Sequence, residues 1–369
     1  MLVGNAPMEN LMVVVGTRPE IIKMAPTVKA LQKREIPFTF VHCGQHYDYN
    51  MSQQFIEELG LPKPHYNCKV KTRFCGEQTA RIITHVERLL NKTKPTLVLV
   101  EGDTNGVLAT ALASIKLGIP VGHVEAGLRS FDLRMPEEHN RRLTDHLSTY
   151  LFAPTKNAEN NLKRESVWGK IYLTGNTVID AIMQNVPRAE KWSKIMEAIR
   201  FEKFALATTH RAENVDNPKV LQNLAEAFME APIPIVYPVH PRTEKRLRQN
   251  GIYTTIKKCE NLQILPPLGY LDFLMLMKKC EFILTDSGGI QEEATAPQIR
   301  KRVLVLRKST ERPEAVEAGF AKVVGTEKES ILKAMKETLE NRCKLPEESP
   351  FGKGDAAEQI VKIIEEELF

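Results

Sequence analysis

Short apolar runs rich in β-branched residues alternate with longer amphipathic segments along the whole chain, and this alternation restricts the fold more than any other feature. The runs are apolar at successive positions, which is typical of parallel strands covered by helices on both faces. Strand–helix alternation with short links predicts an α/β fold of doubly wound, Rossmann-like domains. The candidate strands are LMVVVG, FTFVHCG, TLVLVEGD, PVGHVEAG, YLFAPT and KIYLTGN in the first half, and KFALATTH, IPIVYPVH, LQILPP, EFILTDSGG, RVLVL and KVVGT in the second.

The strands are numerous enough for two sheets, and 369 residues are comfortable for two domains. The likeliest division lies in the segment LTGNTVID, after residue 175. We therefore predict a first Rossmann-like domain over residues 1–175 and a second over residues 176–351. The segment DAAEQIVKIIEEELF predicts an amphipathic helix, about 352–369, that could cross back onto the first domain.

The composition excludes several classes of protein. A net charge of +5 spread over the chain is too weak to indicate nucleic acid, but it suits an acidic small molecule. No apolar run reaches the ~18 residues of a membrane span, and the N-terminus lacks the basic region of a signal peptide. The six cysteines show no C-x-x-C spacing, which favours buried free thiols in a reducing cytoplasm.

Nearly every candidate strand ends in a polar cluster, such as GTRPE, GDT, HVEAG, TTHR and TDSGG. In open α/β sheets, ligands bind outside the carboxyl ends of the strands. Clusters of this kind in both halves of the chain therefore predict one ligand-filled cleft faced by two domains.

Two of these clusters could bind an anion. Ser287, Gly288 and Gly289 lie at a predicted strand-to-helix turn, where free backbone N–H groups attract negative charge. The alternative is a tight turn that needs glycine for positive φ. In GTRPE, Arg18 is a candidate phosphate donor, and Lys23 follows one helical turn later. For Lys23 the alternative is a solvated basic face. No dinucleotide or Walker A fingerprint occurs.

Three carboxylates are candidates for acid–base chemistry. Asp103 and Glu125 end strand-like runs, where an unpaired acid is costly to bury, and Glu137 lies in MPEEHNR. Asp103 could instead cap a helix that begins at Asn105. His210 ends the run ALATTH. The acids and histidines lack H-x-x-x-H or H-E-x-x-H spacing, so we predict no metal site.

The segments GTRPEIIKMAP, HVEAGLRS, PEEHNRRLTDH, TGNTVIDA, THRAEN, DSGGIQEE and TERPEAVEAG together resemble the non-hydrolysing UDP-N-acetylglucosamine 2-epimerase family. The resemblance covers nearly the whole chain in the family's order. It implies the two-domain fold of GT-B glycosyltransferases and a cytoplasmic homodimer that uses no metal, nicotinamide or other cofactor.

The resemblance also implies a reaction, the interconversion of UDP-GlcNAc and UDP-ManNAc. The family expels UDP first, giving an oxocarbenium-like state at C1. Loss of the C2 proton then gives 2-acetamidoglucal, and proton return to the other face and re-addition of UDP give the epimer. Two faces of the sugar need two acid–base groups.

By motif match, the resemblance assigns Glu125 and Glu137 to proton transfer, and Asp103 to cation stabilisation or to orienting the other acids. It places His210 by the diphosphate, which Ser287, Gly288 and Gly289 hold. The remaining substrate-binding positions implied by the resemblance are Arg18, Lys23, Arg141, Phe273, Glu293 and Arg312. A second, activating UDP-GlcNAc could bind Gln45, His46, Arg73, Arg211 and His240, although the surrounding segment GQHYDYNMS is expanded relative to the family.

Other functions remain open on the residues alone. A GT-B glycosyltransferase would transfer sugar without proton exchange at C2. A hydrolysing epimerase would release free ManNAc and UDP. A UDP-sugar sensor that is not an enzyme would need the anion site but not three carboxylates.

Overall fold

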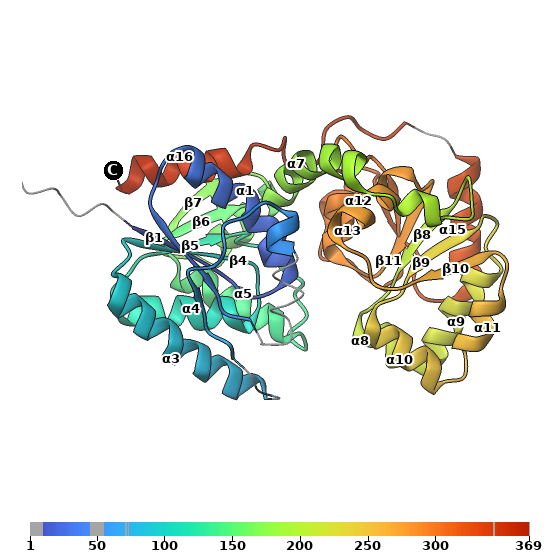
Figure 1. Cartoon of the computed structure of the whole chain (residues 1–369), viewed down its shortest axis with the longest axis horizontal. Coiled ribbons are helices and arrows are strands. Elements are labelled where there is room, and N and C mark those ends of the chain that lie inside the picture. Colours follow the sequence, from blue (N-terminus) through green and yellow to red (C-terminus); the bar gives the residue numbers. More distant parts are fainter. Residues whose placement is uncertain (1–9, 45–54, 71, 73, 342–343, 369) are drawn as a thin grey trace, which may run out of the picture. The chain divides into compact units, whose positions relative to one another are not determined.

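The computed structural model describes residues 10–44, 55–70, 72, 74–341 and 344–368 (Figure 1). The chain separates into two compact units. Unit 1 comprises residues 1–181 and 351–369, and unit 2 comprises residues 182–350. The sequence placed the divisions at 175/176 and 351/352, whereas the structure has them at 181/182 and 350/351.

Unit 1 contains a parallel seven-stranded sheet in the order β3-β2-β1-β4-β5-β6-β7. Strands β1, β4 and β5 are fully buried, as expected for strands between two helical layers. The strands are β1 (Leu11–Val15), β2 (Phe38–His42), β3 (Tyr66–Asn67), β4 (Leu97–Glu101), β5 (Val121–Val124), β6 (Tyr150–Ala153) and β7 (Lys170–Leu173).

The helices of unit 1 follow the strands in alternation. Helix α4 shows how the sequence sets a boundary, because the Thr104 hydroxyl accepts from the Val107 N–H at 3.4 Å and caps its start. The helices are α1 (Arg18–Lys33), α3 (Cys75–Thr93), α4 (Asn105–Lys116), α5 (Pro136–Leu147), α6 (Lys156–Arg164) and α16 (Ala356–Leu368), with α7 (Thr177–Trp192) spanning the division between the units.

The C-terminal helix α16 belongs to unit 1, where it packs against α1 (Figure 1). The buried carboxylate of Asp180 accepts from the Ala356 N–H at 3.3 Å and the Ala357 N–H at 2.9 Å, which caps the helix. Arg34, which directly follows α1, forms ion pairs with Glu358 and Glu365 on the exposed side. The predicted return of this segment is therefore confirmed.

Unit 2 contains a parallel six-stranded sheet in the order β10-β9-β8-β11-β12-β13. Its strands are β8 (Ala205–Thr208), β9 (Ile235–Pro238), β10 (Leu262–Leu265), β11 (Phe282–Thr285), β12 (Arg302–Val305) and β13 (Ala321–Val323). Its helices are the 3₁₀ helix η1 (Ile195–Ala198), α8 (Ala212–Val215), α9 (Pro218–Met229), α10 (Pro241–Gln249), α11 (Tyr253–Lys258), α12 (Tyr270–Lys279), α13 (Gly288–Glu293), α14 (Pro313–Glu317) and α15 (Lys328–Glu340).

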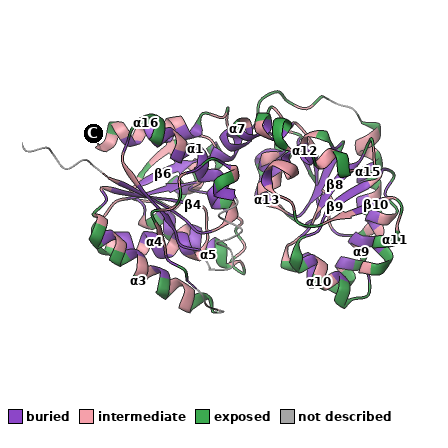
Figure 2. Ribbon diagram, viewed as in Figure 1, coloured by how far each residue is buried: buried purple, intermediate pink, exposed green. Residues whose placement is uncertain are grey.

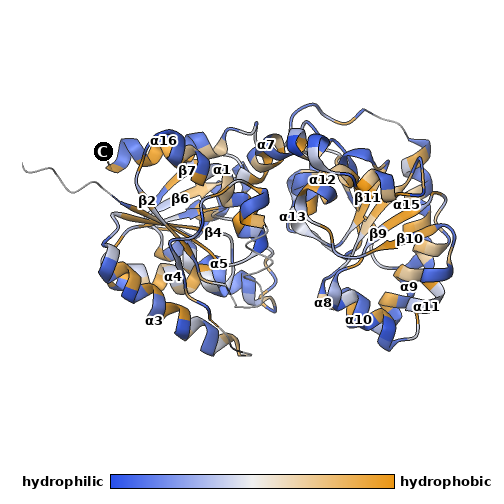
Figure 3. Ribbon diagram, in the orientation of Figure 1, coloured by the Kyte–Doolittle hydropathy of each residue, from blue (hydrophilic) through white to orange (hydrophobic). Residues whose placement is uncertain are grey.

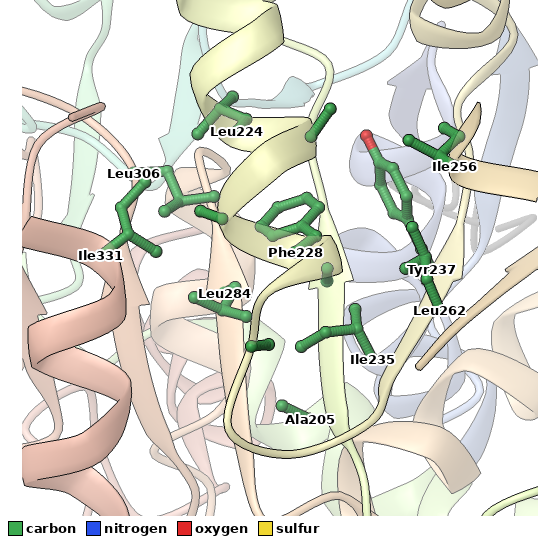
Figure 4. Close-up of a cluster of buried hydrophobic side chains, with 14 of the residues drawn as sticks. Ala205, Leu224, Phe228, Ile235, Tyr237, Ile256, Leu262, Leu284, Leu306 and Ile331 are labelled. Carbon is green, nitrogen blue, oxygen red and sulfur yellow. The ribbon is translucent and has the colours of Figure 1, made fainter. Parts of the chain in front are cut away.

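The core of each unit lies between its sheet and the helices on either face. Figure 2 shows the central strands buried, and Figure 3 shows the same strands as the most hydrophobic segments. In unit 2, Phe228 of α9 meets Tyr237 of β9 edge-on, with ring centroids 5.3 Å apart (Figure 4). Burying such apolar surface contributes about 25 cal/mol per Å² to stability.

The predicted α/β class with two doubly wound sheets is confirmed, and all the predicted strands occur. The sequence missed only β3 among the described strands, because its two residues at the edge of the sheet are too few to show a periodicity. The described cysteines are free, but Cys75 is exposed rather than buried, and Cys343 lies outside the described residues. In the described part of the chain, no helix combines the length and apolar character that crossing a bilayer requires.

Candidate functional site

Each sheet reverses its strand order at one place, and most of the candidate residues gather at these two places. In unit 1 the reversal lies between β1 and β4, and in unit 2 it lies between β8 and β11. At such a switch point the connections leave in opposite directions and open a crevice at the carboxyl ends of the strands. The segment GTRPE follows β1, and EGDT begins with the last residue of β4. In the same way, TTHR begins with the last residue of β8, and TDSGG begins with the last residue of β11.

Lys23 lies at the centre of the unit 1 cluster. Its side chain, on α1, is 10% exposed, so the solvated basic face is excluded. The ammonium lies 3.2 Å from Glu101 Oε1 and forms an ion pair with Glu125 Oε2. The Asn176 amide donates to the same Glu125 oxygen at 3.1 Å. One ammonium therefore serves two buried carboxyl groups.

Two acids of this cluster, Glu101 and Glu20, have raised pKa values. Burial raises the pKa of Glu101 well above its usual range, Lys23 works against the rise, and the carboxylates of Glu125 and Glu20 add to it. Burial also raises the pKa of Glu20 to about 7, although the Gly16 N–H donates to Glu20 at 2.6 Å. Glu20 therefore exchanges a proton near neutral pH.

Asp103 lies in a second group of the same switch point. Arg141 of α5 forms ion pairs with Asp103 and, at 3.0 Å, with Glu138. The Asp103 side chain keeps 31% of its surface exposed, whereas that of Glu138 is fully buried. The alternative that Asp103 caps α4 is wrong, because the Thr104 hydroxyl does so. Asp103 is thus a partly exposed carboxylate held by a buried arginine.

Glu125 sits in a strained backbone conformation directly after β5, with φ of +69°. Non-glycine residues seldom adopt this region, and such residues cluster at functional sites. Asp145 of α5 holds this turn in place. Its carboxylate accepts from the Gly127 N–H at 3.2 Å and contacts a nitrogen of the His123 ring at 2.7 Å. The other His123 nitrogen donates to the Gly102 carbonyl at 2.8 Å. This network joins the loop of Glu125 to the loop of Asp103.

Glu137 stands apart from the other acids. It lies exposed in the first turn of α5, and within the described residues it makes no hydrogen bond or ion pair with Asp103, Glu125 or Lys23. Its neighbour Glu138 instead points inward and accepts from the Ser130 N–H at 2.8 Å. The structure therefore brings together Asp103 and Glu125 with their cations, and leaves Glu137 at the surface of unit 1.

In unit 2, the buried carboxylate of Asp286 organises the turn after β8. It accepts from the backbone N–H groups of His210 and Arg211 at 3.1 Å and 3.0 Å, and from the Asn214 amide at 3.0 Å. His210 Nδ1 lies 3.3 Å from Asp286 Oδ1. Desolvation lowers the pKa of His210, Asp286 works against this, and the cations Arg211, His240 and Arg242 lower it further. His210 is therefore neutral near pH 7 in the isolated protein.

Ser287, Gly288 and Gly289 begin α13. Gly288 and Gly289 do not have positive φ, so the turn that needs glycine for its backbone angles is excluded. A Cβ on Gly289 would meet nothing within 4 Å, and one on Gly288 would come to 3.6 Å from the Arg312 guanidinium carbon. Packing inside the protein thus does not explain why glycine stands at Gly289.

Arginines and acids form a dense ion-pair group beside these glycines. Arg312 forms an ion pair with the fully buried Glu292, and Arg307 with Glu311 at 2.7 Å. Despite burial, the hydrogen bond from Arg307 and the charges of Arg312, Arg307 and Arg211 lower the pKa of Glu311 to about 2. Glu311 is therefore ionised and helps to hold the guanidinium groups in place.

The other predicted residues take varied positions. Glu293 on α13 and Phe273 on α12 are partly buried, and the guanidinium carbon of Arg18 lies 4.3 Å from the centre of the Phe55 ring. The His240 ring centroid lies 5.7 Å from that of His210. Three predicted allosteric residues, Gln45, His46 and Arg73, lie outside the described residues.

The sequence interpretation missed the buried acids of the site, which are Glu20, Glu101, Glu138, Asp145, Asp286, Glu292 and Glu311. A signal for Glu101 was present, because it closes the fully apolar run LVLVE, where a carboxylate must be buried with a partner. Glu20 and Lys23 are three residues apart on a helix, which places them on neighbouring parts of one face. In the described part of the chain, no three His, Cys, Asp or Glu residues are grouped so that they could hold a metal ion.

Comparison with known proteins gives one consistent family. The sequence model of a family described as UDP-N-acetylglucosamine 2-epimerase matches residues 29–365. A Methanocaldococcus jannaschii UDP-N-acetylglucosamine 2-epimerase is 47% identical over 363 residues, which cover 96% of this chain and 98% of the relative.

Two solved structures extend this similarity to the fold. The M. jannaschii enzyme in complex with UDP-GlcNAc and UDP matches with a TM-score of 0.89 and 46% identity, over 97% of this chain and 99% of that chain. The Neisseria meningitidis UDP-GlcNAc 2-epimerase bound to UDP-GlcNAc matches with a TM-score of 0.88 and 37% identity, over 97% and 100%.

Proposed function

The chain belongs to the UDP-N-acetylglucosamine 2-epimerase family, and from this premise we propose that it interconverts UDP-GlcNAc and UDP-ManNAc without net hydrolysis. One observation carries the proposal beyond the family name: the carboxyl groups of Asp103 and Glu125 lie at the switch point of unit 1, paired with Arg141 and Lys23, and the switch point of unit 2 is rich in cations. A nucleotide sugar that is epimerised needs both.

The chemistry explains why several carboxyl groups are required. The C2 proton is not adjacent to a carbonyl, so its direct removal is difficult. In the proposed reaction the C1–O bond to UDP breaks first, and the positive charge at C1 makes the C2 proton acidic. The C2–H electron pair then forms the C1–C2 double bond of 2-acetamidoglucal. Protonation of C2 from the opposite face and reformation of the C1–O bond yield the epimer.

In unit 1 we assign proton transfer to Glu125 and Glu137, and charge stabilisation to Asp103. Glu125 receives an ion pair from Lys23 and a hydrogen bond from Asn176, both of which favour its ionised form and make it a base. Asp103 is partly exposed, so a sugar with positive charge at C1 could approach it. Glu137 is exposed on α5 and could supply the second face.

In unit 2 we assign diphosphate binding to the start of α13 and to the cations near it. The open space beside Gly289 would admit phosphate oxygens close to the backbone. Arg312 would pair with phosphate oxygens, and His210 would donate a hydrogen bond. Phe273 and Glu293 would contact the uridine and its ribose, as the family resemblance implies.

Proton NMR of UDP-GlcNAc incubated with the pure protein in D₂O tests the proposal. We expect deuterium at C2 of both UDP-GlcNAc and UDP-ManNAc. Free ManNAc and UDP as the main products would indicate the hydrolysing class. Sugar transfer to an added acceptor without exchange at C2 would indicate a glycosyltransferase, and UDP binding without turnover would indicate a sensor.

We also propose that the protein acts as a homodimer and that a second UDP-GlcNAc activates it through Arg211 and His240. Sedimentation analysis checks the first proposal, and a monomer at working concentration contradicts it. For the second, epimerisation of UDP-ManNAc should accelerate when a trace of UDP-GlcNAc is added. Equal rates with and without the trace contradict activation.

A further inference from the structure

We propose that Glu101 is a positioning residue for Glu125 and acts on it through Lys23, the ammonium that the two carboxyl groups share. The inference rests on the proposed function, because it concerns the group that we assign to proton transfer at C2. Glu101 does not belong to the set of site residues that the family resemblance supplied.

The sheet brings the two acids together. Glu101 is the last residue of β4, and its partner in the parallel register is Val124, which directly precedes Glu125. Lys23 reaches both acids from α1, and the side chains of Lys23, Glu101 and Glu125 are 10%, 2% and 7% exposed. Because so little water reaches them, each group depends on the others for its charge balance.

Ionising both acids is costly, because two buried carboxylates would then repel each other across the ammonium that they share. Asn176 gives Glu125 a second donor, and this favours the ionised form of Glu125 and the protonated form of Glu101. Burial and the carboxylates of Glu125 and Glu20 favour this protonated form of Glu101, and Lys23 opposes it. Lys23, Glu20 and Glu125 are the charged groups that act on Glu101 from α1 and from the loop after β5.

The shared ammonium couples the two proton affinities. While Glu101 is neutral, the whole charge of Lys23 stabilises the Glu125 carboxylate. Once Glu101 ionises, it competes for Lys23, and Glu125 then holds a proton more tightly. The two acids therefore titrate as a pair with two macroscopic steps. Ionisation of Glu101 therefore makes Glu125 a stronger base on the alkaline side of the pH profile.

Glu101→Gln separates this role from a purely structural one. Glutamine keeps the size of the side chain and an oxygen for Lys23, but it cannot ionise. At the acid end of the pH profile, kcat/KM should stay within about twofold of wild type, since glutamine and protonated glutamate carry the same charge. On the alkaline side, the inflection that Glu101 causes should disappear, with the KM for UDP-GlcNAc unchanged.

Glu165→Gln is the matched control. Glu165 is also an acid of unit 1 with buried contacts, but it pairs with Arg129 and Arg142 rather than with Lys23. Its variant should keep the shape of the wild-type profile. If Glu101→Gln has the same profile shape as wild type, Glu101 is only structural and the inference is wrong.

A titration that needs no turnover completes the test. In protein labelled with ¹³C at the glutamate carboxyl carbons, the Glu125 resonance is identified by its absence from the Glu125→Gln variant. We expect this resonance to show two inflections with pH in wild type and one in Glu101→Gln. A single inflection in wild type overturns the coupling. Two inflections of the Glu125 resonance, without deuterium exchange at C2 of the substrate, would support the inference and refute the proposed reaction.

Discussion

In unit 1, Glu101 and Glu125 share the ammonium of Lys23, whereas in unit 2 Glu292 and Glu311 are paired with arginines. Lys23 pairs with both Glu101 and Glu125, and burial raises the pKa of Glu101. Glu311 lies among Arg307, Arg312 and Arg211, and their charges keep it ionised. Both groups are buried on closely similar parallel sheets, so the ratio of cations to acids decides their state.

This difference indicates that the acids of the two units have different roles. A buried acid with too few cations binds and releases a proton near neutral pH, which suits the chemistry at C2. A buried acid surrounded by arginines has no proton to offer, but it fixes the guanidinium groups so that they can receive an anion. The same residue type thus serves proton transfer in one unit and anion binding in the other.

The largest effect should come from removing the base in unit 1. Glu125→Gln should lower kcat by roughly 10²-fold or more, the scale of general acid–base contributions, and Glu137→Gln should do the same. UDP affinity should stay near that of wild type, because binding of the nucleotide is assigned to unit 2. Steady-state rates and calorimetric titration with UDP measure the two quantities. Near-normal turnover in either variant removes that residue from the chemistry.

A methyl group at the start of α13 should abolish UDP binding by unit 2 without lowering the stability of the free protein. Gly289→Ala adds a Cβ that meets nothing within 4 Å at a residue without positive φ, so the melting temperature of the free protein should not fall. The variant should lose most of the stabilisation by UDP, which is about 2.7 kcal/mol at 100 times the dissociation constant. Calorimetric scans with and without UDP measure both, and an intact UDP shift contradicts the anion site.

The pH dependence of stability should have opposite signs in the two units, beginning with Glu20 in unit 1. Its pKa in the folded state is about 7, above the 4.5 of an unperturbed glutamate. The folded state therefore holds the proton longer, and the contribution of Glu20 to stability declines as pH rises from 4.5 to 7. Glu20→Gln should remove this decline, a gain on the order of 2 kcal/mol at pH 8 relative to pH 4. Hydrogen exchange of unit 1 peptides measures it, and parallel curves for variant and wild type would refute the assignment.

Glu311 in unit 2 should show the reverse. Its folded pKa of about 2 lies below 4.5, so its stabilising contribution is complete above pH 4.5 and is lost as pH falls from 4.5 to about 2. Glu311→Gln should therefore be less stable than wild type above pH 4.5, by on the order of 1–2 kcal/mol, and equal to it near pH 2. Exchange of unit 2 peptides over this range measures the difference. A constant gap at all pH values would show that packing, not charge, is lost.

The smallest effect should come from an exposed ion pair. Asp216 pairs with Arg246 at 2.8 Å, and the two side chains are 32% and 40% exposed. Asp216→Asn should change the free energy of unfolding less than the Glu20 and Glu311 substitutions above do, since solvent and salt screen such pairs. Urea unfolding measures the change. A larger loss would mean that the contrast between buried and exposed pairs does not hold in unit 2.

The strands and the positions of the strand-end loops could be predicted from the sequence, because runs apolar on both faces are a strong local signal. The states of the acids could not be predicted, since they depend on contacts across the sheet. Asp103 was taken as the acid of the β4 loop, yet Glu101, two residues earlier, is the one that meets Lys23. That contact joins residues from α1 and β4, which are far apart in the sequence, so no local sequence pattern predicts it.

The same limit explains why two alternatives stayed open until the structure was known. Lys23 has the sequence surroundings of any helical lysine, and only the fold shows that it is buried. Both glycines of DSGG were compatible with a positive-φ turn, and only the backbone angles exclude it. By contrast, the anion-binding hypothesis drew on glycine and serine at a strand-to-helix turn, which is local information, and it stays a prediction until UDP binding is measured.

The return of α16 to unit 1 has a consequence for the order in which the chain is synthesised. Unit 1 is built from residues 1–181 and 351–369, with the whole of unit 2 between them. The ribosome therefore synthesises all of unit 2 before it synthesises α16, the helix that Asp180 caps. Until then the nascent first segment exposes the face of α1 that α16 later covers. Unit 2 can finish folding during translation, but unit 1, which begins first, finishes last.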